Sequence, residues 1–155
     1  MIVVITYGTF DLFHVGHVRL LKRLKELGSK LIVGISSDEF NKVKGKNSFF
    51  SYEERAEIVS SCRYVDGVFP EHTWEQKRSD ILKYKASILG MGDDWEGKFD
   101  DFNDICSVVY LERTENVSST KIKKSLSAVT SEDIVKIEDQ LHGLISIVKS
   151  LAAVK

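Results

Sequence analysis

Two histidines, His14 and His17, stand three positions apart, and Gly16 lies between them. They follow the segment 8–13, which reads Gly-Thr-Phe-Asp-Leu-Phe. Imidazole rings at this spacing can reach one phosphate group, and each can donate a hydrogen bond to an oxygen that gains negative charge. A lone histidine is more often structural, but this pair with its intervening glycine favours a site. The segment therefore predicts an anion-binding site with two donors.

Two elements must position these rings. Residues 1–7 predict a buried strand, because the apolar run 2–5 is β-branched and Gly8 ends the pattern. A helix with apolar residues near helical spacing follows the histidines and ends at Gly28. The amino end of that helix directs N–H groups and the positive end of its dipole at the turn, which also favours an anion there.

The rest of the chain alternates strands with helices. Further strands are predicted at 30–36, 64–69, 87–91 and 107–111, and helices at 51–62 and 74–84. This rhythm is typical of right-handed βαβ units, so we expect an α/β fold: a Rossmann-like, doubly wound, parallel five-stranded sheet with helices on both faces. Ligands collect beyond the carboxyl ends of such strands. Three loops begin there, and we expect them to line one cleft: 8–17, 92–97 and 113–120.

Composition narrows the class of protein. The chain has 155 residues, is 43% hydrophobic and carries a formal net charge of −1, as expected for one compact soluble domain. Its basic residues form no dense run, so we expect neither nucleic-acid nor membrane binding. No signal-like or membrane-spanning segment is recognisable, which favours the cytoplasm. Cys62 and Cys106 lie far apart without nearby partners, so no zinc site is expected.

The C-terminal segment differs from the rest. We expect a main domain at 1–128 and a helical extension at 129–155. Apolar residues of the extension follow a heptad-like pattern, and acidic residues at 132 and 133 suit the start of a helix. The extension can pack on its own domain or pair with a second subunit, and the sequence favours neither.

Two segments resemble signatures of the cytidylyltransferases in the nucleotidyltransferase superfamily: the histidine region and 113–120, Arg-Thr-Glu-Asn-Val-Ser-Ser-Thr. The resemblance covers residues 1–126. Segments 74–77 and 91–99 are similar to the members that use glycerol 3-phosphate. Asn116 stands where the family usually has glycine, but asparagine tolerates a left-handed backbone, so we expect the turn to be kept.

The resemblance implies a reaction and its partners. A phosphomonoester oxygen of sn-glycerol 3-phosphate attacks the α-phosphorus of CTP, pyrophosphate leaves, and CDP-glycerol forms for teichoic acid or capsule precursors. No covalent enzyme intermediate is implied. Mg²⁺ is expected to bind mainly through the CTP phosphates, with no metal-ligating side chains assigned, and a homodimer is expected.

The resemblance also assigns roles. The catalytic set comprises His14, His17, Lys44, Lys46 and Arg113. Arg113 would clamp the β- and γ-phosphates, because a guanidinium offers paired donors. Lys44 and Lys46 flank Gly45 in a predicted loop at 42–46; Lys44 would bind the acceptor phosphate and Lys46 the triphosphate. The nucleotide-binding residues are Gly8, Thr9, Phe10, His14, Gly16, His17, Lys46, Asp94, Arg113, Thr114, Val117, Ser118, Ser119 and Thr120. Asp94 would accept a hydrogen bond from the cytosine amine.

Acceptor binding is assigned to a further set: Asp11, Lys44, Lys77, Arg55, Arg63 and Asp66. For Asp11 a turn-capping role competes, and for the last three residues surface ion pairs compete. Two other functions stay open. One is cytidylyl or adenylyl transfer to another phosphorylated alcohol, and the other is a noncatalytic nucleotide-binding regulatory module.

Overall fold

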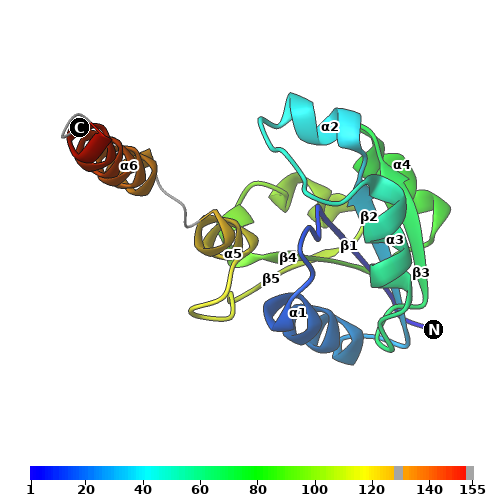
Figure 1. The fold of residues 1–155 in the computed structure, drawn as a ribbon. Coiled ribbons are helices and arrows are strands. Elements are labelled where there is room, and N and C mark those ends of the chain that lie inside the picture. Colours follow the sequence, from blue (N-terminus) through cyan, green and yellow to red (C-terminus); the bar gives the residue numbers. More distant parts are fainter. Residues whose placement is uncertain (128–130, 153–155) are drawn as a thin grey trace. The chain divides into compact units, whose positions relative to one another are not determined.

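The computed structural model describes residues 1–127 and 131–152 (Figure 1). It divides the chain into two compact units, 1–119 and 120–155, which are described separately below. The predicted boundary after residue 128 stays a prediction.

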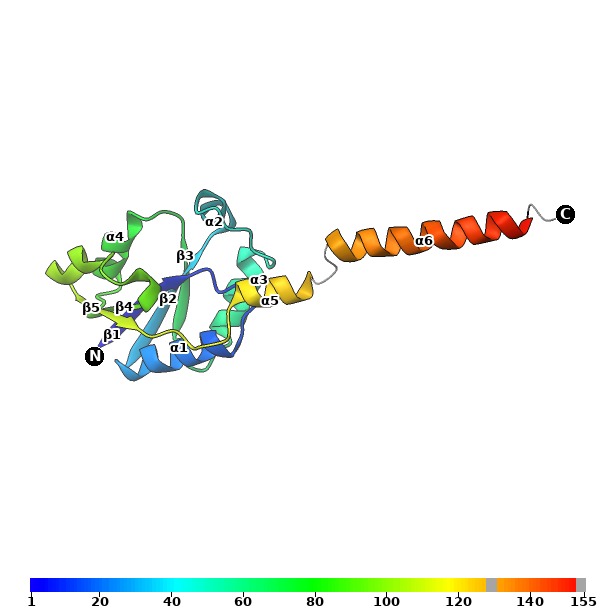
Figure 2. The same cartoon turned by 90° about the vertical axis from the view of Figure 1, so that its left-hand side faces the viewer.

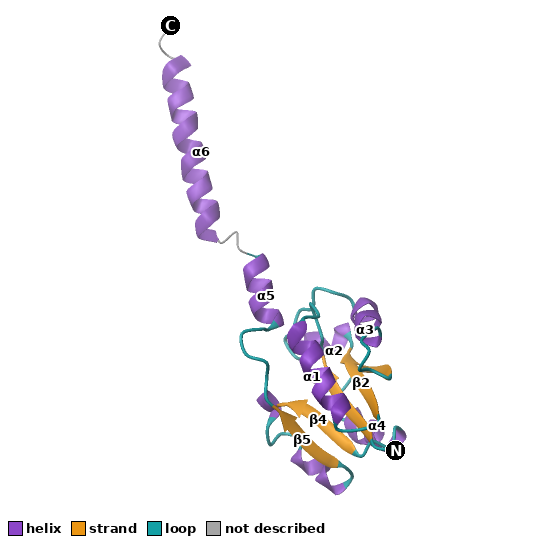
Figure 3. Ribbon diagram, turned by 90° about the horizontal axis from the view of Figure 1, so that it is seen from below, coloured by secondary structure: helices purple, strands orange, loops and turns teal. Residues whose placement is uncertain are grey.

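A five-stranded parallel sheet forms the centre of the first unit, as predicted (Figure 3). Its strand order is β3-β2-β1-β4-β5. The strands are β1 (Val3–Gly8), β2 (Lys30–Ser36), β3 (Gly67–Glu71), β4 (Ile88–Gly92) and β5 (Ser107–Leu111). Because β1 lies between β2 and β4, the connections diverge at its carboxyl end, the position where open α/β sheets bind ligands.

Helices cover both faces of this sheet because successive β1 side chains point to opposite sides. Val4 packs in one cluster with residues of α1 (Val15–Glu26) and α3 (Tyr52–Ser60). Val3, Ile5 and Tyr7 belong to a second cluster with residues of α4 (Gln76–Lys83). This second cluster also contains Phe99, which lies between the 3₁₀ turns η1 (Asp93–Trp95) and η2 (Asp100–Asp104). The doubly wound arrangement is confirmed.

Residues 38–43 form a short helix, α2 (Asp38–Val43), that the sequence did not predict. Ser37 caps it by accepting a 3.1 Å hydrogen bond from the Phe40 N–H, and Phe40 is buried. Six residues are too few to show helical periodicity, so cap and burial decide this element. As a result Lys44 stands at the helix terminus rather than within an irregular loop.

Strand β3 begins and ends later than the predicted 64–69. Residues 64–66 complete a turn in which the Val65 N–H donates to Cys62 and the Asp66 N–H donates to Leu31. The strand tolerates Pro70 because it lies at the edge of the sheet. The shift makes Glu71 the last residue of β3 and so places it at the carboxyl edge.

The second unit begins within α5 (Ser119–Leu126) and contains α6 (Ser131–Ala152), which Figure 2 shows as one continuous helix. The large apolar side chains of α6 are 48–71% exposed. They are Ile134, Val135, Ile137, Leu141, Leu144, Ile145, Ile147, Val148 and Leu151. Across residues 1–127 and 131–152, no helix is both long and apolar enough to cross a membrane.

Candidate active site

The two histidines form the amino terminus of α1 themselves. His14 is the N-cap residue, and its Nδ1 accepts a 3.0 Å hydrogen bond from the Gly16 N–H. In return, Nδ1 of His17 accepts a 3.2 Å bond from the His14 N–H. This reciprocal capping box fixes both rings against the backbone.

These bonds also determine where each ring carries its proton. Because both Nδ1 atoms accept, each neutral ring holds its hydrogen on Nε2, which is then a donor. Burial, reinforced by the neighbouring His14 and opposed by Asp11, lowers the pKa of His17 to about 3. Burial and then the charge of Arg113 lower the pKa of His14 as well. At neutral pH the site therefore presents two neutral imidazoles, whose centroids lie 3.9 Å apart.

The turn before the histidines is tightly wound. Phe10 and Leu12 both adopt positive φ angles, 53° and 47°, which non-glycine residues rarely do. The Phe10 and Phe13 rings each lie 5.4 Å from the His17 ring, centroid to centroid. A Cβ on Gly16 would come within 2.8 Å of Cε1 of His14. Gly16 is thus needed for the position of the His14 ring.

The loop after β5 reaches the same turn. The Ser119 hydroxyl donates a 2.5 Å hydrogen bond to the backbone oxygen of Asp11, and Thr114 is a near neighbour of Gly16. Arg113 lies close enough to His14 to affect its pKa. Asn116 has a φ of 64°, which confirms that asparagine keeps the left-handed turn here. The predicted residues Val117 and Ser118 lie in this loop, and Thr120 follows Ser119 in α5.

The loop after β4 adds an exposed carboxylate. Asp94 lies in η1 at the carboxyl end of β4, the strand next to β1. A Cβ on Gly92 would meet Oδ1 of Asp94 at 2.7 Å. Trp95 contacts the rings of Trp74 and Phe99 at centroid distances of 5.4 and 5.5 Å, so it belongs in part to the core.

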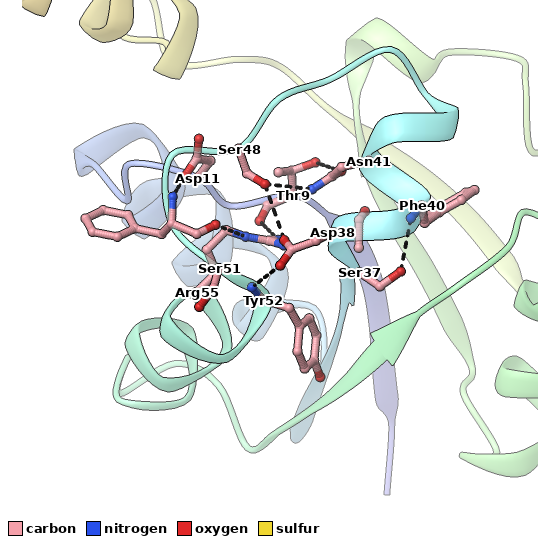
Figure 4. Close-up of polar contacts among 12 residues, drawn as sticks. Thr9, Asp11, Ser37, Asp38, Phe40, Asn41, Ser48, Ser51, Tyr52 and Arg55 are labelled. Atoms are coloured by element: carbon pink, nitrogen blue, oxygen red, sulfur yellow. Dashed lines mark hydrogen bonds and ion pairs between the residues drawn. The ribbon is translucent and has the colours of Figure 1, made fainter.

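Asp11 and Arg55 fasten the segment after α2 to the turn after β1 (Figure 4). The Asp11 carboxylate accepts hydrogen bonds of 2.7 and 3.0 Å from the N–H groups of Phe49 and Phe50. The Arg55 side chain is fully buried and donates to the backbone oxygens of Thr9 and Phe50. It also pairs with Asp38 at 2.7 Å. These two predicted acceptor ligands thus support the loop, and their contact with an acceptor stays a prediction.

Lys44 and Lys77 meet at one buried carboxylate, that of Glu71. Nζ of Lys77 donates to Oε1 of Glu71, and Nζ of Lys44 lies 3.8 Å from Oε2. Nζ of Lys44 also donates a 2.6 Å bond to the Ser36 hydroxyl, which itself donates to Oε2. Burial lowers the pKa of Lys44 to about 8, partly offset by Glu71. The two predicted acceptor lysines are therefore brought together.

Other predicted residues lie apart from this cluster. Asp66 accepts hydrogen bonds from the Leu31 N–H and the Lys25 ammonium at the amino end of β2. Arg63 lies in the same turn before β3. Because β2 and β3 are parallel, this end of the sheet is opposite the site, so the structure does not bring Arg63 and Asp66 to the lysines. Lys46 is exposed, and its N–H donates to the backbone oxygen of Asn41.

Sequence reasoning missed Ser36 and Glu71. Each is the final residue of a strand at the carboxyl edge of the sheet, and the two side chains are hydrogen-bonded. A polar residue at the carboxyl end of a predicted parallel strand is the sequence signal that could have identified them as site residues. This signal did not identify Glu71, because the third strand was predicted to end at Phe69, two residues before Glu71.

A family model described as cytidylyltransferase-like matches residues 5–125. The chain belongs to the cytidylyltransferase-like family. The glycerol-3-phosphate cytidylyltransferase of Bacillus subtilis (strain 168) is 56% identical over 126 residues, which are 81% of this chain and 98% of that protein. The glycerol-3-phosphate cytidylyltransferase of Staphylococcus aureus (strain NCTC 8325 / PS 47) is 53% identical over 123 residues, or 79% of this chain and 93% of that protein.

The fold of this chain also resembles that of a solved structure. The lipopolysaccharide core biosynthesis protein from Thermoplasma volcanium GSS1 superposes with a TM-score of 0.64 at 24% identity, and the match covers 74% of this chain and 99% of that one. The family match ends at residue 125, before α6 begins. The cytidylyltransferase-like part therefore contains the histidines and lysines described above, and α6 lies outside it.

Proposed function

We propose that this cytidylyltransferase-like chain transfers CMP from CTP to sn-glycerol 3-phosphate, giving CDP-glycerol and pyrophosphate. The observation that carries the proposal is its identity of 53–56% to two glycerol-3-phosphate cytidylyltransferases over nearly their whole lengths. The paired imidazoles at the amino end of α1 supply donors suited to this chemistry. We assign the reaction to the cytoplasm and its product to teichoic acid or capsule precursors.

In the proposed mechanism the acceptor phosphate oxygen attacks the α-phosphorus of CTP directly, opposite the departing pyrophosphate. Little covalent chemistry falls to the protein, so positioning and charge stabilisation account for the rate. His14 and His17 donate from Nε2 to oxygens of the α-phosphate as negative charge develops there. Both rings stay neutral while they donate these hydrogen bonds, because their lowered pKa values disfavour protonation.

Charged side chains complete the proposed site. Arg113 holds the β- and γ-phosphates, and Lys46 assists from the segment after α2. Lys44 and Lys77 hold the acceptor phosphate, and the Glu71 carboxylate lies beside both of their ammonium groups. Asp94 accepts a hydrogen bond from the cytosine amine, a donor that uracil lacks.

Mg²⁺ belongs to the proposal as a companion of CTP. Among residues 1–127 and 131–152, no group of three or more histidine, cysteine, aspartate or glutamate side chains is arranged to hold a metal ion. We propose that the CTP phosphates and water supply the ligands of the ion, as is common for Mg²⁺ bound with a nucleotide. The bound ion would neutralise charge on the triphosphate.

A homodimer is also proposed, with α6 pairing against its copy. Ile134, Leu141 and Val148 alternate with Ile137, Leu144 and Leu151 in a heptad pattern, and these side chains are about half exposed or more. The amino-terminal part of α6 is mainly acidic, and lysines stand near the carboxyl end of the chain. Antiparallel pairing would place these opposite charges together.

Pyrophosphate release tests the proposed activity. The full chain with Mg²⁺ would be assayed with CTP, ATP, UTP and GTP, each against glycerol 3-phosphate, phosphoethanolamine, phosphocholine and ribitol 5-phosphate. We expect release with CTP and glycerol 3-phosphate. Release with another pair alone would replace the substrates, and folded protein that binds CTP without turnover would favour a noncatalytic module.

A further inference from the structure

Glu71 ends β3 with its carboxylate almost completely enclosed. The side chain is 2% exposed, and those of its partners Lys77 and Lys44 are 1% and 9% exposed. Each oxygen of the carboxylate contacts a different lysine, and the Ser36 hydroxyl donates to Oε2 at 2.7 Å. One acidic group thus joins two basic groups from different elements, the end of α2 and the first turn of α4.

Aromatic rings enclose the same lysines. Nζ of Lys44 lies 4.6 Å from the ring centroid of Phe40 and 5.6 Å from that of Trp74. Nζ of Lys77 lies 4.6 Å from the Trp74 ring and 4.5 Å from that of Tyr7. Such rings favour cations but do not hydrate them. Both ammonium groups therefore border one ring, Trp74, in a region with little water.

Two desolvated ammonium groups this close to one carboxylate would repel each other and lose protons without it. The carboxylate opposes both effects, because its charge raises the pKa of each lysine against the lowering by burial. With both lysines charged, the three groups carry one net positive charge. This arrangement suits a phosphomonoester dianion, which can bind two ammonium groups at once.

We infer that Glu71 is a positioning residue of the acceptor site, whose buried carboxylate holds the ammonium groups of Lys44 and Lys77 together for the phosphate of glycerol 3-phosphate. The inference rests on the proposed function and adds to it a residue without direct substrate contact. Both Glu71 oxygens are engaged with lysines and Ser36, so Glu71 acts through these groups.

A pH dependence follows from the same cluster. Lys44 faces Glu71, which raises its pKa, and Lys46, Lys77 and Arg55, which lower it. With a pKa of about 8, Lys44 loses its charge as pH rises through that value. The kcat/KM for glycerol 3-phosphate should then decline on the alkaline side. Removing the charge of Glu71 should move this decline to lower pH.

The test compares Glu71→Gln and Glu71→Asp with the wild-type full chain. We expect Glu71→Gln to raise the KM for glycerol 3-phosphate on the order of 10-fold or more, the loss typical of one charge-assisted contact, while the KM for CTP changes little. In this variant the alkaline decline of kcat/KM for glycerol 3-phosphate should shift to lower pH. Glu71→Asp keeps the charge and should restore the wild-type pH profile in part. It also serves if the glutamine variant does not fold.

Asp80→Asn is the matched control. Asp80 is also buried and lies on α4, but it accepts hydrogen bonds from the Tyr7 hydroxyl and the Gln76 amide instead of lysines. The charge of Asp80 also raises the pKa of Lys77, so we expect Asp80→Asn to raise the KM for glycerol 3-phosphate less than Glu71→Gln does. The alkaline decline of kcat/KM that Lys44 causes should stay at its wild-type pH, because the charges that shift the pKa of Lys44 are those of Glu71, Lys46, Lys77 and Arg55. Equal increases in both KM values for folded Glu71→Gln, or an unmoved alkaline decline, would overturn the inference.

Failure of the proposed function has a separate signature. Wild-type protein that makes no CDP-glycerol would remove the function but leave Glu71 testable by calorimetry with glycerol 3-phosphate alone. Weaker binding to Glu71→Gln than to wild type would then support the positioning role. Equal binding to both proteins would overturn it.

Discussion

The unit of residues 1–119 and helix α6 differ in how far their apolar residues are exposed. In the first, the sheet places alternate residues in two buried clusters, and residues such as Val4, Ile5 and Leu89 are 0% exposed. In α6, residues of the same types are 48–71% exposed. A helix in water gains most of its stability from packing an apolar face. The proposed catalytic residues lie in the unit with its own core, and the homodimer proposed above would give the apolar face of α6 a surface to pack against.

Replacing His14 should give the largest effect on turnover and should confine it to the first unit. His14→Asn retains a side-chain acceptor for the cap but loses the Nε2 donor, so kcat should fall roughly 100-fold or more at nearly unchanged stability. His14→Ala loses the cap as well, which costs about 1 kcal/mol of unfolding free energy. Steady-state assays and chemical denaturation distinguish the two variants. Wild-type turnover in His14→Asn would remove His14 from the mechanism.

A glycine-to-alanine change should lower turnover at Gly16 but leave turnover unchanged at Gly143 in α6. Gly16→Ala would press a methyl group on the His14 ring, and we expect turnover to fall about 10-fold as the donor moves. Gly143→Ala in α6 meets no atom within 4 Å. It should leave turnover unchanged and increase helix stability by roughly 0.5–1 kcal/mol. Equal turnover in both variants would contradict the role given to Gly16.

Acid should destabilise the first unit through His17. Its folded pKa, about 3, lies below the ordinary value of 6.5, so the unfolded chain binds more protons between these values. The unfolding free energy should then fall as pH decreases from 6.5 toward 3, by up to about 1.4 kcal/mol per pH unit from this group, and no further below 3. Urea titrations at several pH values measure this slope. His17→Asn should flatten it, and a slope identical to wild type would show that His17 is not the group involved.

Changing α6 should have the smallest effect on turnover. Leu141→Asp combined with Leu144→Asp puts charges into the apolar face, so helix pairing should weaken while kcat stays within about 2-fold of wild type. Sedimentation across a concentration series would report a larger dissociation constant. Ser146→Asp provides a control that should leave assembly unchanged, because Ser146 lies outside the heptad positions of Leu141 and Leu144. An unaltered dissociation constant in the double variant would exclude α6 from the interface.

Agreement between sequence and structure depends on how local each signal is. Strands β2 and β5 match their predicted bounds, because each contains a short, mainly apolar and β-branched run next to polar residues. Helix α2 was missed because its six residues depend on the Ser37 cap and on burial of Phe40. Asp66 is a carboxylate beside a strand, as a site residue often is, but it lies at the amino end of the sheet.

The sequence by itself determined the order of the five strands, the histidine pair at a helix start and the left-handed turn at Asn116, because these depend on neighbouring residues and backbone preferences. Only the tertiary structure decided that Glu71 joins Lys44 to Lys77, and that Asp11 and Arg55 support a loop. Most of these contacts connect residues that are distant along the chain, and Glu71 and Lys77, although near in sequence, lie on different elements. They arise when parallel strands align their carboxyl ends, and a buried charge must then find a partner there.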